Sequence, residues 1–143
     1  MKLKFKKIGV YLMAIFYVFA GVNHFLHPEF YLQIIPPYFP AHETLNKLAG
    51  IAEISGGVLL IFPGTRNFAA WQIILMLLIF FTVHIYMIQK APMQLGSLTV
   101  TPFIAWLRIP LQFILIFWAY NYTSSKKLHR IVAVQECDAT KAT

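Results

Sequence analysis

Four long apolar runs dominate this chain and constrain its fold more than any other feature. They cover residues 8–26, 45–63, 68–88 and 102–123. Each has about 20 residues, the length that an α-helix needs to cross the hydrocarbon core of a bilayer. With 59% hydrophobic and 12% charged residues, the 143-residue chain is also too apolar for a soluble domain of this size. The sequence therefore predicts an all-α integral membrane four-helix bundle, with residues 1–143 in one membrane domain.

The first apolar run has two interpretations. It follows a basic leader that contains Lys2, Lys4, Lys6 and Lys7, as a secretory signal would. The run is long, however, and it continues directly into Asn23 and His24. We therefore favour a retained first helix.

The distribution of basic residues predicts the orientation in the membrane. One side carries most of them: Lys2, Lys4, Lys6, Lys7, Arg66, Lys126, Lys127 and Arg130. The other side carries only Lys47 and Lys90. The positive-inside rule then places both termini of this multi-pass protein in the cytoplasm. On this interpretation the net charge of +7 is a topology signal and not a sign of nucleic-acid binding.

The segments between the runs have distinct expected roles. Residues 28–44 carry Pro36, Pro37 and Pro40, which exclude a regular helix there, so we expect this Pro-rich segment to cover the outer end of the bundle. Thr44 is the expected cap of the second helix. Residues 89–101 are expected to form a loop, and the tail, residues 124–143, is expected to be disordered. Pro110 predicts a kink in the fourth helix.

Glu53 is the most unusual residue in the apolar runs. A charged side chain inside a bilayer costs at least about 2.5–3.5 kcal/mol, so a carboxylate there needs a proton, a partner or a wet cavity. Arg108 is the one cation placed deep in another run, so the sequence predicts that Glu53 and Arg108 meet. Gly50 and Gly57 share a helix face with Glu53, and small residues of this kind let another membrane helix come close.

Other polar residues lie at a similar depth. Counted from the outer ends of the runs, His24, Glu53, His84, Arg108 and Gln112 all fall in the outer half, and they come from four different helices. Asn23 adjoins His24 at the same level. This layering predicts one polar cluster inside the bundle, open toward the outer face under the Pro-rich segment. Tyr17 and Trp106 are candidates to line an apolar slot beside it.

Five short stretches carry a resemblance to a known family. They are Gly21-Val22-Asn23-His24-Phe25, Ile35-Pro36-Pro37-Tyr38-Phe39-Pro40, Ala52-Glu53-Ile54-Ser55-Gly56-Gly57-Val58-Leu59-Leu60, Ile85-Tyr86-Met87 and Trp106-Leu107-Arg108-Ile109-Pro110-Leu111-Gln112. In this order they resemble the DoxX-like family of small bacterial membrane proteins. The resemblance implies a location in the bacterial inner membrane. It also implies a small accessory subunit of a quinone-linked oxidoreductase, or a member of an oxidative-stress or assembly complex.

Each candidate residue also has a purely structural interpretation. Glu53 and Arg108 can form an ion pair that fixes the register of two helices, and the histidines can be interfacial or hydrogen-bonded residues. His24, His84 and Glu53 could supply a two-histidine, one-carboxylate metal site, but the nearby Arg108 cation argues against it, so no metal is expected. The single Cys137 excludes an intrachain disulfide and a Cys-x-x-Cys redox pair.

Two functions remain open at this point. In the first, the polar cluster binds a small amphipathic redox molecule such as a quinone, and a partner subunit supplies electrons, because the sequence has no motif for haem, flavin or nucleotide. In the second, the protein is a non-catalytic assembly or anchoring protein, and the polar cluster only specifies the fold. Whether the chain is an enzyme stays open. Its expected partners are the lipid bilayer, a redox subunit and further copies of itself; a transporter would require such oligomerisation.

Overall fold

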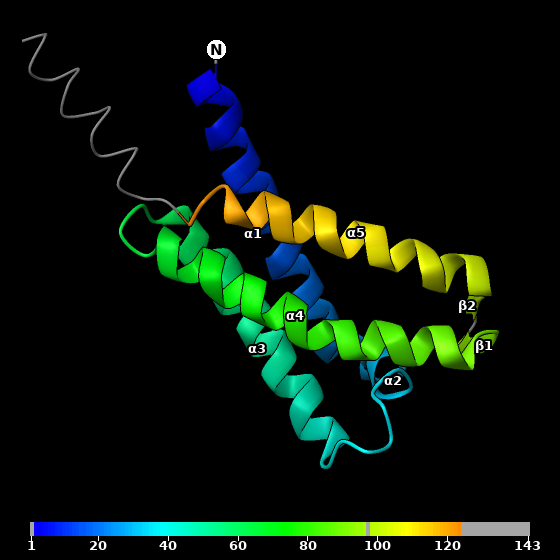
Figure 1. Cartoon of the computed structure of the whole chain (residues 1–143). Coiled ribbons are helices and arrows are strands. Elements are labelled where there is room, and N and C mark those ends of the chain that lie inside the picture. The colour runs from blue at the N-terminus through cyan, green and yellow to red at the C-terminus, as the bar shows by residue number, and fades with distance from the viewer. Residues whose placement is uncertain (1, 97, 124–143) are drawn as a thin grey trace, which may run out of the picture.

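The computed structural model describes residues 2–96 and 98–123, which are mostly helical (Figure 1). The elements follow the order α1 (Lys2–Leu26), α2 (Pro28–Leu32), α3 (His42–Ile61), α4 (Arg66–Lys90), β1 (Met93–Leu95), β2 (Leu98–Val100) and α5 (Pro102–Tyr120). The expected tail, residues 124–143, lies outside the described residues, as does Cys137.

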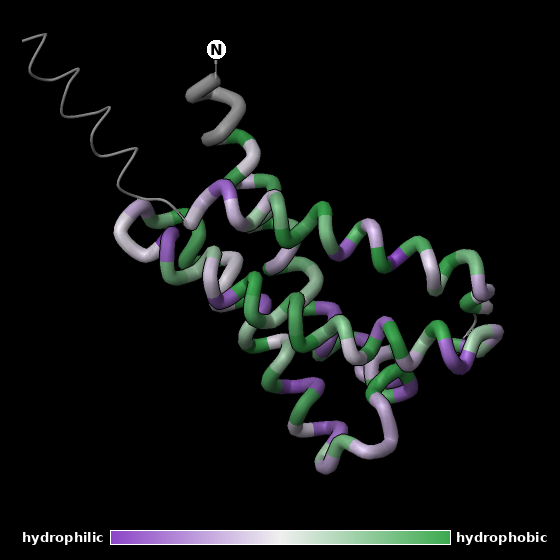
Figure 2. The backbone as a smooth tube through the Cα atoms, in the orientation of Figure 1, coloured by the Kyte–Doolittle hydropathy of each residue, from purple (hydrophilic) through white to green (hydrophobic). Residues whose placement is uncertain are grey.

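Four helices, α1, α3, α4 and α5, are long and apolar enough to cross a membrane. Figure 2 shows that hydrophobic residues cover most of their length. Many of these residues point away from the interior: Phe19, Phe103 and Phe117, for example, are 74%, 74% and 69% exposed. Such an apolar surface is stable only against lipid or another apolar partner. The predicted multi-pass membrane protein with four spanning helices is thereby confirmed.

The helices begin and end slightly away from the predicted residues: α3 and α4 begin earlier, whereas α3 and α5 end earlier. α3 begins at His42 and not at residue 45, so Thr44 lies in its first turn; the residue at the N-cap is Ala41, in the left-handed conformation with φ 52°. α4 begins at Arg66 and not at residue 68. The Arg66 side chain donates hydrogen bonds to the carbonyl oxygens of Leu60 and Ile61, at 2.9 and 3.0 Å, which satisfies free carbonyl groups at the end of α3.

Glycines bring α1 and α3 into close contact. A Cβ atom added at Gly21 of α1 would lie 2.6 Å from the carbonyl oxygen of Gly50 on α3. One added at Gly57 would lie 2.8 Å from the carbonyl oxygen of Ala14 on α1. The two backbones therefore touch, as the small-residue face of α3 predicts. The approaching helix is α1, however, and not the helix that carries Arg108.

The spanning helices pack in the order α1, α3, α4, α5, so that α5 lies against α4 and not against α3. The main core lies where α1, α3 and α4 meet, around the fully buried side chains of Met13, Tyr17, Leu60 and Ile73. α5 continues through Pro110 as one uninterrupted helix. The neighbour order matters for the polar residues, because it separates α3 from α5.

A second, smaller core closes one end of the bundle, which we call the hairpin end. Residues 89–101, expected to be a loop, contain β1 and β2 as an antiparallel hairpin that turns at Gly96, where φ is +58°. Leu95 and Val100 of the hairpin are buried, and Phe30 and Ile34 of the segment that follows α1 pack on this core. A Cβ at Gly96 would lie 2.7 Å from the Phe30 ring.

The Pro-rich segment folds over the hairpin end of the bundle, and it is not irregular throughout. That this end is the outer one stays a prediction. Its first residues form α2, a helix of five residues that begins with Pro28 at its N-terminus, where a missing N–H group is harmless. The three later prolines lie outside any helix. The short helix brings Tyr31 over the polar side chains below it.

Candidate functional site

Two hydrogen bonds join His24 of α1 to Asn46 of α3. His24 Nδ1 lies 2.7 Å from Asn46 Oδ1, and Asn46 Nδ2 donates to the carbonyl oxygen of His24 at 2.9 Å. Both side chains are buried. The Gly21–Gly50 contact lets the two helices come close enough for these bonds. Asn46 was not among the residues predicted from the sequence.

The structure pairs Glu53 with His24 and not with Arg108. Glu53 is 6% exposed, and its Oε2 atom lies 3.5 Å from His24 Nε2. The predicted Glu53–Arg108 contact is wrong because α3 packs on α1 and α4, whereas Arg108 lies on α5. His24 therefore faces two polar residues of α3, one through each ring nitrogen.

Tyr31 of α2 covers this group from the hairpin end. Its ring stacks on the His24 ring, with the centroids 3.6 Å apart and the planes 24° apart. Asn23 Nδ2 donates to the Tyr31 hydroxyl at 2.9 Å. Burial raises the pKa of the Tyr31 phenol; the Asn23 hydrogen bond lowers this pKa, the charge of Glu53 raises it, and the charge of Arg108 lowers it. Tyr31 is thus within electrostatic range of polar residues from both α3 and α5.

A second set of polar side chains joins α4 to α5. His84 Nε2 lies 3.1 Å from Gln112 Oε1, and Gln112 Nε2 donates to the carbonyl oxygen of Leu77. Gln112 is buried, and Arg108 is half-buried one turn before it on α5. We call this set the α4–α5 polar group (His84, Arg108, Gln112) and the other the α1–α3 polar group (His24, Asn46, Glu53, with Asn23 and Tyr31 above). The residues of the predicted cluster thus form two groups, and Tyr31 lies within electrostatic range of a charged residue in each.

Several buried polar atoms in the described part of the chain have no hydrogen-bond partner. They are Tyr17 Oη, Glu53 Oε2, His84 Nδ1 and Arg108 Nε. These four residues belong to α1, α3, α4 and α5, so each spanning helix contributes one. A buried polar atom without a partner costs about 1–3 kcal/mol, and native proteins contain few of them. Because such atoms occur on all four spanning helices, they are the feature of the molecule that most needs an explanation.

Trp106 does not belong to this site. It is 61% exposed and lies on the lipid-facing surface of α5, whereas Tyr17 is 2% exposed and lies in the core. The predicted slot between these two residues is therefore wrong. His84 contacts Gln112, and the residues that the structure describes hold no group of three potential metal-ligating side chains.

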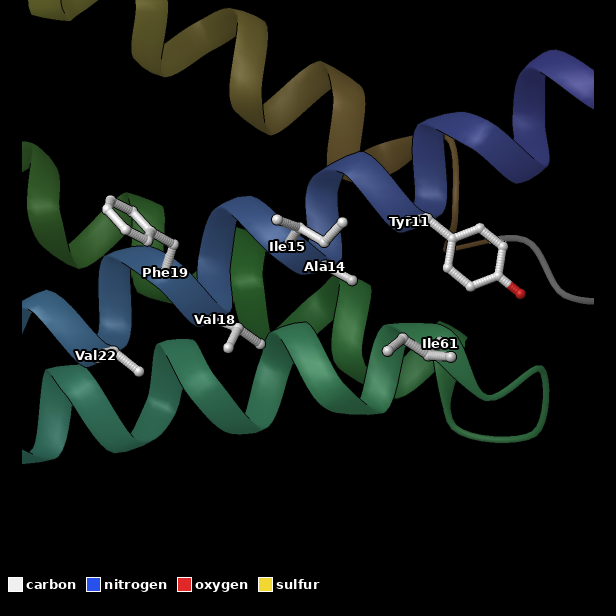
Figure 3. A pocket seen from close by; sticks show the side chains of 7 residues that line it. All are labelled: Tyr11, Ala14, Ile15, Val18, Phe19, Val22 and Ile61. Carbon is white, nitrogen blue, oxygen red and sulfur yellow. The ribbon is translucent and has the colours of Figure 1, made fainter.

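Two hollows lie near the site, and neither contains the unpartnered atoms. An apolar groove of about 460 Å³ runs along the lipid-facing side of α1 (Figure 3). It is lined by Tyr11, Ala14, Ile15, Val18, Phe19, Val22 and Ile61. It shares no residue with either polar group. A smaller hollow of about 260 Å³ at the hairpin end is lined by Pro28, Leu32, Glu43, Asn46 and Lys47, so it borders the α1–α3 polar group.

Comparison with known proteins places the chain in a family. A family model described as a domain of unknown function, DUF8561, matches residues 13–123, which include both polar groups. The chain belongs to this family. The resemblance to the DoxX-like family is therefore wrong. No curated protein and no solved structure matches the chain. The function of the chain therefore has to be inferred from its site.

The pairing of Glu53 can be tested with two double-mutant cycles. Because Glu53 contacts His24, Glu53→Gln and His24→Gln are expected to be non-additive, with a coupling of about 0.5–3 kcal/mol in the free energy of unfolding. The cycle of Glu53→Gln with Arg108→Gln is expected to show a smaller coupling. Unfolding in mixed micelles, titrated with a denaturing detergent, measures both. A larger coupling in the Arg108 cycle would contradict the pairing.

Proposed function

We propose that this protein binds the polar head of a small amphipathic molecule, such as a quinone, between its spanning helices, and that it serves as an accessory subunit of a membrane redox system. The observation that supports the proposal is the set of four buried polar atoms without a hydrogen bond, one on each spanning helix. Of these, Glu53 Oε2 has the 3.5 Å contact with His24 Nε2. A ligand that reaches these atoms would satisfy them, and their burial would strengthen each hydrogen bond.

The chemistry of these atoms defines the kind of ligand. Arg108 Nε–H is a donor, and the Tyr17 hydroxyl can donate as well, so both suit a carbonyl oxygen. Gln112 donates its amide N–H to Leu77, so its oxygen faces His84 and accepts from His84 Nε2–H. His84 Nδ1 is then an acceptor without a donor. Oxygen atoms that act as acceptors in one state and as hydroxyl donors in another, as in a quinone and its quinol, match this set.

The proposed location follows from charge. Basic residues gather at the N-terminus and at Arg66, opposite the hairpin end, so the positive-inside rule favours cytoplasmic termini and an outward-facing hairpin end. In a bacterium this is the inner membrane. The polar groups would then open to the outer side beneath α2. In this proposal the described residues hold no electron-carrying cofactor. A partner subunit supplies the electrons.

A second candidate is a non-catalytic assembly or anchoring protein. The hydrogen bonds between His24 and Asn46 favour it, because they are complete without any ligand and fix how α1 lies on α3. Buried polar residues often specify one packing arrangement in this way. This function does not explain the unpartnered atoms of Arg108 and His84, which is why we place it second.

Native mass spectrometry with lipid extraction separates the two functions. The protein is purified gently from its own membrane as wild type, as Arg108→Gln and as Arg66→Gln, a matched change at the opposite end. We expect an amphipathic small molecule to co-purify with wild type and Arg66→Gln, and to be reduced at least about tenfold in folded Arg108→Gln, which corresponds to about 1.4 kcal/mol of binding free energy. An empty wild-type bundle that carries a stoichiometric protein partner would overturn the ligand proposal and support the assembly function.

A further inference from the structure

Asn46 determines which nitrogen of His24 carries a proton. The Asn46 side-chain nitrogen donates to the backbone carbonyl oxygen of His24, so the amide oxygen must be the atom that faces His24 Nδ1. An amide oxygen only accepts hydrogen bonds. At 2.7 Å, Nδ1 must therefore carry a hydrogen in every protonation state that keeps this contact.

This constraint leaves Nε2 to face the carboxyl group of Glu53. A neutral His24 with hydrogen on Nδ1 presents a lone pair at Nε2, and an ionised Glu53 presents another at Oε2, 3.5 Å away. Two lone pairs repel each other, and no other described group donates to Oε2. The contact becomes attractive when one proton is present, either on Nε2, beside a carboxylate, or on the carboxyl group, beside a bare nitrogen.

We propose that His24 and Glu53 hold a single exchangeable proton between them, and that Asn46 is the positioning residue that aims His24 Nε2 at Glu53. With one proton the pair has no net charge, which suits its depth in the membrane. The two side chains then titrate as one unit and not as separate groups.

The titratable and charged groups around this pair come from four other places on α1, α2, α4 and α5. Tyr31 of α2 covers His24 by stacking and receives its own hydrogen bond from Asn23. Tyr17 of α1 lies within electrostatic range of Glu53. On α4 and α5, His84 bonds to Gln112, and the Arg108 cation lies within electrostatic range of Tyr31.

The pair can give one proton to a bound molecule or take one from it. A ligand with an ionisable hydroxyl, such as a quinol, is the chemical class that would use this. Only this transfer of a proton to or from a ligand rests on the proposed function. The number of protons that His24 and Glu53 share is a property of the protein without ligand and can be tested in that state.

Two spectroscopic measurements on the full chain in lipid nanodiscs, at neutral pH, count the proton. Nitrogen NMR of ¹⁵N-histidine protein, assigned through Asn23 and Phe25, reports the hydrogen on each His24 ring nitrogen. Infrared difference spectra against Glu53→Gln report whether the Glu53 carboxyl group is protonated. We expect hydrogen on Nδ1, and one proton in total on Nε2 and the carboxyl group. A bare Nδ1, or a total of zero or two, would overturn the proposal.

His84 and a variant provide the comparisons. The Gln112 side-chain oxygen faces Nε2 of His84, whereas the Asn46 oxygen faces Nδ1 of His24. Neutral His84 should therefore carry its hydrogen on Nε2 in the same spectrum. Asn46→Leu removes the acceptor for His24 Nδ1, and we expect the hydrogen to move to Nε2, where Glu53 accepts it. Asn67→Leu, at an exposed position of α4, should change nothing. If Asn46→Leu folds and retains hydrogen on Nδ1 with a bare Nε2, Asn46 is not the positioning residue.

Discussion

Replacing Gly21 by alanine is expected to destabilise the protein by about 1–3 kcal/mol, the usual cost of overpacking a tight interior. The added Cβ would lie 2.6 Å from the carbonyl oxygen of Gly50 and 2.8 Å from the backbone nitrogen of Ile54. These are backbone atoms of α3, which cannot rotate away as a side chain can. The two helices must separate, and His24, three residues after Gly21, would then lose its register with Asn46.

The free energy of unfolding in mixed micelles measures this effect, and two other glycines calibrate it. Gly64→Ala should be neutral, because a Cβ there meets nothing within 4 Å. Gly56→Ala should be intermediate, because its Cβ would lie 3.1 Å from a side-chain atom of Ile73, which can adjust. Alanine is favoured over glycine inside a helix by about 1 kcal/mol, which works against the expected loss. Gly21→Ala as stable as wild type would mean that α1 and α3 do not touch here.

The spanning helices were predictable from the sequence because their signal is local. Each apolar run is long enough to cross a bilayer, so the number of spans follows from length and hydropathy. The exact first and last residues of each helix did not follow from length and hydropathy. Arg66 extends α4 by bonding to carbonyl groups of α3, and the hairpin at 93–100 is held by packing against Phe30. Both depend on contacts between segments, which local patterns do not report.

The positions of the polar residues along each helix followed from the sequence, but their partners did not. Counting along each run places Glu53 and Arg108 at similar levels, and charge complementarity then favours a pair. Which helices are neighbours depends on packing, and the glycines of α3 bring α1 to Glu53 instead. One signal for Asn46 was present: it lies seven residues before Glu53, on the same face as Gly50 and Gly57.

The family was not predictable from short motifs. Small residues, prolines and single polar residues recur in membrane helix bundles for reasons of packing, so the same combinations arise in different families. The five stretches that resemble the DoxX-like family are of this kind. The match to DUF8561 shows that the family inferred from them was wrong.

Replacing Gln112 by leucine is expected to destabilise the protein by about 1–2 kcal/mol, the upper part of the range for hydrogen bonds between membrane helices. Leucine is similar in size, so the change tests polarity more than volume. It removes the bond to the carbonyl oxygen of Leu77 and leaves His84 Nε2–H without its acceptor, inside a buried site. A buried donor without an acceptor accounts for most of the expected loss.

The loss should be confined to the contact between α4 and α5. Hydrogen exchange in nanodiscs should increase in α5 near residue 112, while α1 and α3 keep the protection of wild type. The reason is that, among the described residues, the side chain of Gln112 bonds to α4 alone. Gln89→Leu is the matched control, since Gln89 is exposed near the end of α4. If Gln112→Leu also increases exchange around His24 and Asn46, the two polar groups act as one unit, and a single cluster, as the sequence predicted, describes the site better than two.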